Sequence, residues 1–300
     1  MYHRIAEESF DPWGLAVAPE RFAEQLRWLS ENRAVLPLPE FAALHRDGSL
    51  PDSAVALTFD DGYECAAEVA APLMTQLGIP ATIFLPVELI ERGDPFWWDE
   101  LEQLVLGFDG EVLRLDDVQI PVGERQAGDS RWKPGAPPRT SRQAAFQRLW
   151  SLLQPKPPNQ LDEAMVELRS QARPGRPPSA RPMTAGQARS LLGTGIAFGS
   201  HALTHPFLTS LKSLQKSQEI GVSMDRCEAL VGYRPSAFAY PYGNFDSESE
   251  RLVEQAGFAC ACTTKRSAVS AKSRMFALPR IQAGNWTAKS LSRALAAAPR

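Results

Sequence analysis

Residues Val55 to Tyr63 read VALTFDDGY, an apolar run that ends abruptly in two carboxylates and a glycine. A short apolar run of this kind is typical of a buried strand. It places Asp60 and Asp61 at the carboxyl end of that strand, where α/β folds form their active sites. Adjacent side chains on a regular strand point to opposite faces, so both carboxylates serve one site only if the strand breaks. Gly62 permits the break, although a turn that merely closes a strand is the alternative for this motif alone.

Short apolar runs alternate with helical patterns on both sides of this motif. Strands are expected at residues 54–59, 81–85, 196–200, 237–240, 258–264 and 276–281, and helices at 19–30, 64–77, 211–231 and 247–256. Such alternation predicts βαβ units that build a mostly parallel sheet or barrel.

The middle of the chain has a different texture. Between residues 107 and 182, proline-rich stretches such as KPGAPPR and ARPGRPPSARP flank two expected helices, at 141–153 and 161–171. We expect a single domain over residues 1–300 that carries the 107–182 segment as an insertion. A chain of 300 residues with 44% hydrophobic content is long enough to bury a substantial core.

Composition argues against several classes of protein. A formal net charge of −3 and a pI near 5.9 provide no basic field for nucleic acid or an anionic membrane. The four cysteines show no CxxC spacing and indicate buried thiols in a reducing compartment. The sequence has no apolar stretch of the roughly 20 residues that a membrane span needs, and no signal peptide. As the chain is written we expect a cytoplasmic protein, with an upstream signal lost by truncation as the open alternative.

A second polar motif, SHALTHP, follows a later apolar run. It spaces His201 and His205 four residues apart, and Pro206 disfavours helical geometry at His205, so we expect a loop. Imidazole is the commonest neutral ligand for zinc-like ions, and the chain has only four histidines. Together with Asp61 they make a three-ligand set that leaves positions for water and substrate, as in hydrolytic sites. Asp60 is then available as a base.

The motifs TFDDGY, SHALTHP and AFAYPYG, in this order and each at an expected strand end, resemble the polysaccharide deacetylases with a NodB-homology domain, carbohydrate esterase family 4. Segments such as IPATIFLPVELI, FWWDELE and LPRIQ resemble a bacterial subgroup linked to surface-polysaccharide synthesis. The likeness covers most of the chain outside residues 108–181. It implies an α/β fold, a distorted (β/α)7-type barrel, with the metal at the carboxyl ends of its strands. It also implies metal-dependent hydrolytic deacetylation of N-acetylated sugars in a poly- or oligosaccharide.

The resemblance implies roles for individual residues. Asp60 would be the general base, while Asp61, His201 and His205 would hold one divalent ion. Zinc is the first expectation for this ion, with cobalt, nickel, manganese or iron as alternatives. Tyr242 of the PYG motif would give its backbone N–H to an oxyanion hole.

Two positions depart from the family's pattern. Many members carry an arginine two residues before the Pro-Tyr pair to orient the base, and here that position is Ala239. Arg280 is the candidate replacement, with an exposed salt-bridging arginine as the alternative. Members also commonly supply a late histidine as general acid, and this chain has none after His205. His3 resembles an N-terminal histidine that serves this role in members with a rearranged motif order, and an anionic Asp60 nearby is expected to favour its protonated form. A frayed terminal residue is the alternative.

The expected partner is a carbohydrate, and the expected substrate contacts are Pro241, Tyr242 and Trp286. Trp97, Trp98, Tyr240 and Trp286 are candidate platforms for sugar rings, with core packing as the alternative. The site residues leave the substrate open between an N-acetyl sugar, an O-acetyl ester and a lipid-linked sugar. A non-catalytic carbohydrate-binding relic of the fold is a further alternative, because fold alone does not fix function.

Overall fold

The computed structural model describes residues 1–172 and 180–299, which divide into two compact units. The first, the barrel unit, comprises Met1–Glu7, Leu15–Gly93 and Pro182–Arg300. The second, the helical unit, comprises Glu8–Gly14 and Asp94–Arg181. The helical unit therefore begins earlier than residue 107, and the single domain with a 107–182 insertion stays a prediction. Within the described residues, no helix is both long and apolar enough to cross a membrane.

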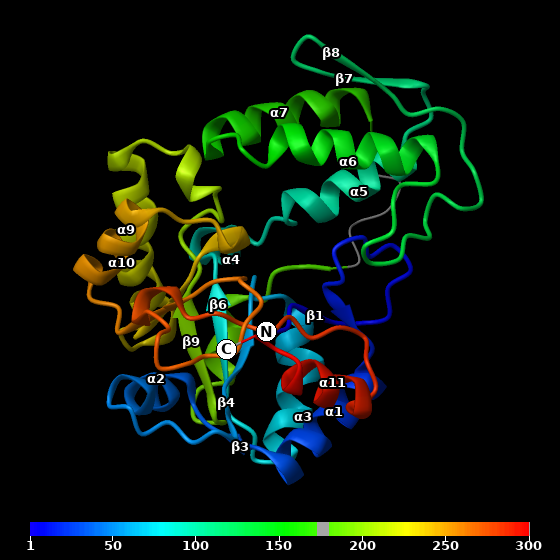
Figure 1. Cartoon of the computed structure of the whole chain (residues 1–300). Coiled ribbons are helices and arrows are strands. Elements are labelled where there is room, and N and C mark those ends of the chain that lie inside the picture. Colours follow the sequence, from blue (N-terminus) through cyan, green and yellow to red (C-terminus); the bar gives the residue numbers. More distant parts are fainter. Residues whose placement is uncertain (173–179, 300) are drawn as a thin grey trace. The chain divides into compact units, whose positions relative to one another are not determined.

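Short strands and helices alternate along the barrel unit (Figure 1). Its strands are β1 (Arg4–Ile5), β2 (Ala16–Val17), β3 (Ala34–Val35), β4 (Ala54–Val55), β5 (Leu57–Phe59), β6 (Ala81–Leu85), β9 (Ile196–Ser200), β10 (Ala237–Ala239) and β11 (Cys260–Cys262). Its α-helices are α1 (Pro19–Asn32), α2 (Leu38–Arg46), α3 (Ala71–Gln76), α4 (Val87–Arg92), α8 (Ala185–Ser190), α9 (Ser213–Val231), α10 (Ser247–Ala256) and α11 (Ala288–Ala296). A π-helical turn, η1 (Ala66–Ala70), leads into α3, and three 3₁₀ turns are η2 (Leu208–Ser210), η3 (Pro241–Gly243) and η4 (Met275–Ala277).

Five parallel strands form the central sheet, in the order β11-β10-β9-β6-β5. These strands are buried on both faces, which explains why they read as nearly continuous apolar runs in the sequence. Two small parallel pairs, β1 with β2 and β3 with β4, lie outside this sheet. Helix α9 packs against α10, and α1 packs against α11 (Figure 1).

Two single bridges extend the curled sheet at its edges. Tyr2 makes a parallel bridge with Phe59 beside β5, and Leu278 makes one with Cys262 beside β11. Met1 then joins the two flanking segments, because its amino group donates to the carbonyl of Ile281 and its own carbonyl accepts from Ala283, both at 2.9 Å. Seven chain segments thus make a distorted barrel, and the predicted α/β fold is confirmed.

Several expected elements are shorter than the sequence indicated. The run at 54–59 is split at Ala56 into β4 and β5, which pair with different neighbours. The strand expected at 276–281 is wrong: residues 275–277 form η4, and the segment after it makes only the bridge at Leu278. Pro279 lacks an N–H group and therefore cannot extend a ladder on that side.

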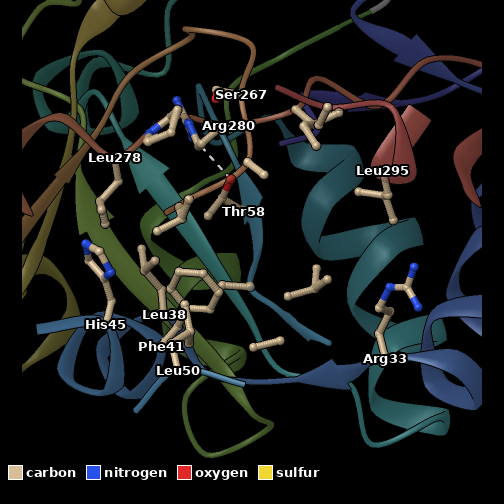
Figure 2. A pocket seen from close by; sticks show the side chains of 18 of the residues that line it. Arg33, Leu38, Phe41, His45, Leu50, Thr58, Ser267, Leu278, Arg280 and Leu295 are labelled. Atoms are coloured by element: carbon tan, nitrogen blue, oxygen red, sulfur yellow. Dashed lines mark hydrogen bonds between the residues drawn. The ribbon is translucent and has the colours of Figure 1, made fainter. Parts of the chain in front are cut away.

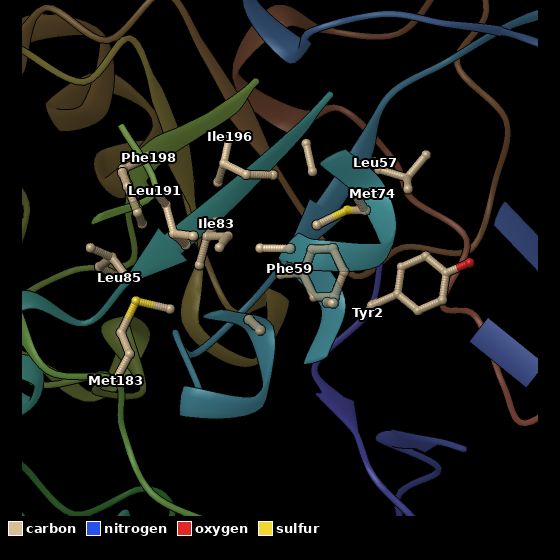
Figure 3. Packing of buried hydrophobic residues seen from close by; sticks show 14 of the residues in the cluster. Tyr2, Leu57, Phe59, Met74, Ile83, Leu85, Met183, Leu191, Ile196 and Phe198 are labelled. Atoms are coloured by element: carbon tan, nitrogen blue, oxygen red, sulfur yellow. The ribbon is translucent and has the colours of Figure 1, made fainter. Parts of the chain in front are cut away.

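The main hydrophobic cluster fills the space between the sheet and helices α1, α3 and α11. Ile83 and Leu85 of β6 point into it, while Phe84 between them belongs to a second cluster with β10 and β11, as the two-residue period of a strand requires. Figure 3 shows Phe59, Ile83 and Met74 gathered in the main cluster.

A cavity of about 690 Å³ lies in the barrel unit beside β4 and β5. Its wall includes residues 54–58 of β4 and β5 together with side chains from α2 and α11. Figure 2 shows Leu38 and Phe41 of α2 in this wall, and Arg280 above them, hydrogen-bonded to Thr58 at 3.1 Å. Asp60 and Asp61 follow the carboxyl end of β5.

The helical unit has three helices and one antiparallel hairpin within its described residues. These are α5 (Trp97–Gly107), α6 (Ser141–Leu153) and α7 (Pro158–Gln171), with β7 (Val112–Leu115) and β8 (Val118–Pro121) as the hairpin. The rings of Trp97 and Trp150 lie 4.8 Å apart, and Trp97 and Trp98 are almost fully buried. Core packing therefore describes Trp97 and Trp98 better than an exposed platform.

We predict that Phe59→Ala lowers the free energy of unfolding by about 3–5 kcal/mol, because a buried aromatic ring is replaced by a cavity. Phe59 is fully buried, and its ring centroid lies 5.3 Å from that of Tyr2 and 5.8 Å from that of Phe22. Urea unfolding monitored by circular dichroism measures the change. Leu214→Ala, at an exposed position of α9, is the control and should change the value by less than about 0.5 kcal/mol. Equal losses in both variants would contradict the packing described here.

Candidate active site

The chain turns sharply after β5, and this turn brings two adjacent carboxylates to one site. Asp61 and Gly62 have φ values of 69° and 66°, in the left-handed region, so the extended chain of β5 does not continue beyond Asp60. A side chain at Gly62 is disfavoured by its φ and because a Cβ atom there would lie 2.6 Å from Cδ2 of Leu85, so the buried leucine would have to move. The strand break that the sequence required at Gly62 is therefore present, and it also involves Asp61.

Asp61, His201 and His205 converge at the carboxyl ends of β5 and β9. Oδ1 of Asp61 lies 3.5 Å from Nε2 of His201 and 3.3 Å from Nε2 of His205. One donor atom from each residue lies within 4.8 Å of the others, and all three side chains are buried. Tetrahedral ligands about 2.0–2.1 Å from a zinc ion are separated by about 3.3–3.4 Å from one another. The donor set and its spacing therefore fit one divalent ion.

Backbone contacts fix the direction of the His201 ring. Nδ1 of the ring lies 2.7 Å from the carbonyl oxygen of Ala239, at the end of β10. The backbone N–H of His201 donates to the carbonyl of Leu85. A ring whose Nδ1 donates to a carbonyl presents Nε2 as the acceptor, which is the arrangement that orients metal-ligating histidines. Ala239, the position at which the family's arginine is missing, thus contributes its backbone to the site.

The pKa shifts of Asp61 and His205 also suit a metal. Burial alone would raise the pKa of Asp61, but its contacts with the two imidazoles outweigh this and hold that pKa far below its usual range. Burial lowers the pKa of His205 even though Asp61 opposes this. A carboxylate and a neutral imidazole are the forms that bind a metal.

Asp60 is held by Arg280 in a buried, two-pronged ion pair. Nη1 and Nη2 of Arg280 each donate to one carboxylate oxygen at 2.6 Å, and the two side chains are 6% and 2% exposed. Nε of Arg280 donates to the carbonyl of Thr263 at 2.9 Å. Burial would raise the pKa of Asp60, but Arg280 outweighs it and lowers that pKa. Arg280 is therefore not the exposed arginine of the alternative reading.

His3 is buried beside the same carboxylates. It follows Tyr2, whose carbonyl accepts from the N–H of Asp60, so the first segment of the chain is paired with the end of β5 rather than frayed. Nδ1 of His3 has no hydrogen-bond partner among the described residues. Burial lowers the pKa of His3, and this outweighs the opposite influence of Asp61 and Asp60. Asp60 thus acts on His3 in the expected direction, but the net shift is downward because the buried imidazole loses its hydration.

The expected substrate contacts lie in two different places. Pro241 and Tyr242 form η3 directly after β10, and Tyr242 has a φ of 57°. The ring of Tyr242 lies 4.5 Å from that of His205, so this turn adjoins the histidines. Trp286 instead packs against the main hydrophobic cluster, and its carbonyl accepts from Nε2 of Gln25 at 2.8 Å. A substrate contact at Trp286 stays a prediction.

Sequence reasoning did not single out one acidic residue next to the histidine loop. Glu219 of α9 is buried and accepts hydrogen bonds from Leu203 and Thr204, between the two histidines. No sequence motif marks it, because it is one of 35 acidic residues and lies within an ordinary helical pattern.

We predict that Arg280→Met lowers the free energy of unfolding at neutral pH by about 3–5 kcal/mol, because the Asp60 carboxylate is left buried and unpaired. In the wild type the lowered pKa of Asp60 contributes stability above the ordinary carboxyl pKa of about 3.9, which is lost as the pH falls. In Arg280→Met, burial raises the pKa of Asp60, so this variant loses stability as the pH rises. The difference in free energy of unfolding between the wild type and the variant should therefore shrink toward about pH 4.

Urea unfolding of both proteins between neutral pH and about pH 4 measures this deficit. Arg274→Met is the control, because Arg274 pairs with Glu250 at 2.7 Å while its own side chain is 64% exposed. It should lose less than about 1 kcal/mol at any pH. A deficit in Arg280→Met that does not change with pH would contradict the assigned ion pair.

Comparison with known proteins connects this geometry to a family. Residues 47–107 and 175–261 match the family described as polysaccharide deacetylase. The Bacillus subtilis protein YxkH, named as a polysaccharide deacetylase, is 19% identical over 94% of this chain and 69% of its own length. The Escherichia coli poly-beta-1,6-N-acetyl-D-glucosamine N-deacetylase is 33% identical, but over only 29% of this chain and 13% of its own length.

Among solved structures, the Streptococcus pyogenes deacetylase PplD in complex with acetate superposes with a TM-score of 0.66. The superposition covers 98% of this chain and 96% of that one at 19% identity, a likeness that concerns the fold. The matched segments contain both TFDDGY and SHALTHP, whose side chains the fold brings together. This chain belongs to the polysaccharide deacetylase family.

Proposed function

We propose that this protein is a metal-dependent hydrolase that removes acetyl groups from N-acetylated sugars in a poly- or oligosaccharide. One observation carries the proposal: one carboxylate and two imidazoles with the spacing of metal ligands lie next to a second carboxylate, Asp60, that takes no part in that set. A hydrolytic site needs both components, ligands that leave coordination positions open and a separate base.

Asp61, His201 and His205 would hold one divalent ion, with zinc as the first expectation. When bound, such an ion supplies a Lewis acid that polarises a carbonyl oxygen and lowers the pKa of water. The neighbouring His201–Ala239 contact would keep the imidazole in the orientation that the ion requires.

The remaining residues of the site would handle protons and developing charge. Asp60 would accept a proton from the attacking water, while Arg280 keeps the carboxylate ionised and fixes its orientation. The backbone N–H of Tyr242 would stabilise the oxyanion that forms on the acetyl carbonyl. His3 would donate a proton to the departing amine, which is otherwise a very poor leaving group. A lowered pKa makes the protonated imidazole of His3 a stronger but scarcer acid.

The choice of an N-acetylated sugar rests on the relatives. The Escherichia coli and Staphylococcus aureus relatives that match 28–29% of this chain at 30–33% identity are named poly-beta-1,6-N-acetyl-D-glucosamine N-deacetylases. Pro241 and Tyr242 would contact the substrate beside His205, and Trp286 is a more distant proposed contact. The acetyl group of an amide or an ester presents the same carbonyl to these residues, so the substrate class must be tested directly.

Acetate release from N-acetylated oligosaccharides, measured with each of zinc, cobalt, nickel and manganese, tests the proposal.

We predict that Asp60→Asn keeps its metal but loses about 10²- to 10⁴-fold in turnover, because an amide cannot accept the proton. Asp225→Asn, on the exposed surface of α9, is the control and should keep full turnover. Unchanged turnover in metal-loaded Asp60→Asn would assign the base elsewhere, and no release from any acetylated sugar or ester would refute the proposed activity.

For His3→Ala, we predict that the metal stays bound while turnover of an N-acetyl substrate falls by about 10²-fold or more, because the amine then leaves unprotonated. A substrate with a much better leaving group should be partly spared. His45→Ala is a matched control, because His45 lies in the last turn of α2 and its Nε2 is 2.9 Å from the carbonyl oxygen of Ser273. Equal losses on amide and activated-ester substrates, or no loss at all, would remove His3 from the mechanism.

A further inference from the structure

The loop that carries both histidines has an unfavourable backbone conformation. Ala202 has a φ of 63° and His205 a φ of 58°, both in the left-handed region that residues with a Cβ atom avoid. Two such residues within four positions do not keep their conformation by local preference. Contacts from other elements must therefore hold the loop, and with it the separation of His201 and His205.

A buried carboxylate lies against the middle of this loop. Oε2 of Glu219 accepts from the N–H groups of Leu203 at 2.9 Å and Thr204 at 3.0 Å. Oε1 accepts from the Thr204 hydroxyl at 2.7 Å. Glu219 belongs to α9, which also contacts β9 through Ser223, whose hydroxyl lies 2.6 Å from that of Ser200. Helix α9 thus contacts Ser200, which precedes His201, and also Leu203 and Thr204, which precede His205.

The loop is held from another direction by the start of α4. The carbonyl of Ala202 accepts from the N–H of Val87 at 3.3 Å, and that of Leu203 accepts from the N–H of Glu88 at 3.0 Å. Two carbonyl groups and two N–H groups between the histidines therefore have partners on different elements, α4 and α9. The α4 contacts use backbone groups, whereas α9 holds the loop through the side chain of Glu219.

Keeping a carboxylate at this position has a cost for the fold. Glu219 is 7% exposed, and burial raises its pKa even though three donors oppose the rise. Its contacts are with neutral donors of the loop, whereas a packing role could be filled by an apolar side chain without that desolvation. What a carboxylate adds is two acceptor oxygens that bind three donors at once.

We propose that Glu219 is a positioning residue that sets the separation of the two imidazoles and thereby the affinity of the site for its divalent ion. This inference rests on the proposed metal-dependent function. Replacing a group that orients metal ligands without touching the metal typically weakens metal binding by about 10- to 100-fold.

The test is a competition titration of zinc and of cobalt against a chelator, with the full chain. Glu219→Gln should bind each ion about 10- to 100-fold more weakly, because its amide nitrogen cannot accept from the loop. At saturating metal its kcat should recover most of the wild-type value with little change in KM. Glu228→Gln is the matched control: Glu228 lies in the same helix, pairs with Arg234 at 2.9 Å and has a side chain that is 43% exposed, so the metal affinity of this variant should stay unchanged.

Further variants keep the inference falsifiable if Glu219→Gln does not fold. Thr204→Val removes only the hydroxyl donor, and Glu219→Asp keeps the charge with a shorter reach, so both should weaken metal binding by a smaller factor. A merely structural role would lower the thermal midpoint of the metal-free protein while leaving the metal dissociation constant unchanged, and that result overturns the inference. A wild-type protein that binds no divalent ion would instead refute the proposed function itself.

Discussion

Two adjacent carboxylates at the end of a buried strand repel each other and lose hydration, so neither stays ionised there unless each has its own partner. Asp60 and Asp61 meet this constraint in different ways. Asp60 receives a guanidinium, which remains charged at any physiological pH, and Asp61 receives two imidazoles. The strand break between them separates the two side chains into these environments. Much of the barrel unit can be understood as the scaffold that brings those partners to one place.

The partners come from far along the chain, and short strands suffice to deliver them. Arg280 and Asp60 are 220 residues apart, yet the first segment of the chain lies between β5 and the segment that carries Arg280. Single backbone bridges at Tyr2 and Leu278 position these segments, and buried side chains around Phe59 pack beneath them. Parallel strands place their carboxyl ends at a common edge, so residues from several segments meet at one site.

What the sequence could predict follows from how local each feature is. The sequence indicated the strand ends near Asp60 and Ser200, and with them the two histidines. An apolar run followed by polar residues is visible within ten positions. The pairing of Arg280 with Asp60 could only be proposed through the family resemblance, since no local pattern links residues so distant. Glu219 was missed for the same reason. The lowered pKa of His3 was not anticipated either, because burial is a property of the folded chain and not of the tripeptide around a histidine.

The hydrogen bond between Arg280 and Thr58 has a consequence for how protons travel in this molecule. The guanidinium of Arg280 lines the cavity beside β4 and β5 and also pairs with Asp60. Its donors are directed to Asp60, Thr58 and Thr263. An arginine does not release a proton at physiological pH, so it cannot serve as a relay between the two compartments. The guanidinium therefore offers no relay for protons between the cavity and the carboxylate. Proton exchange at Asp60 is then left to the groups that face it from the carboxyl ends of the strands.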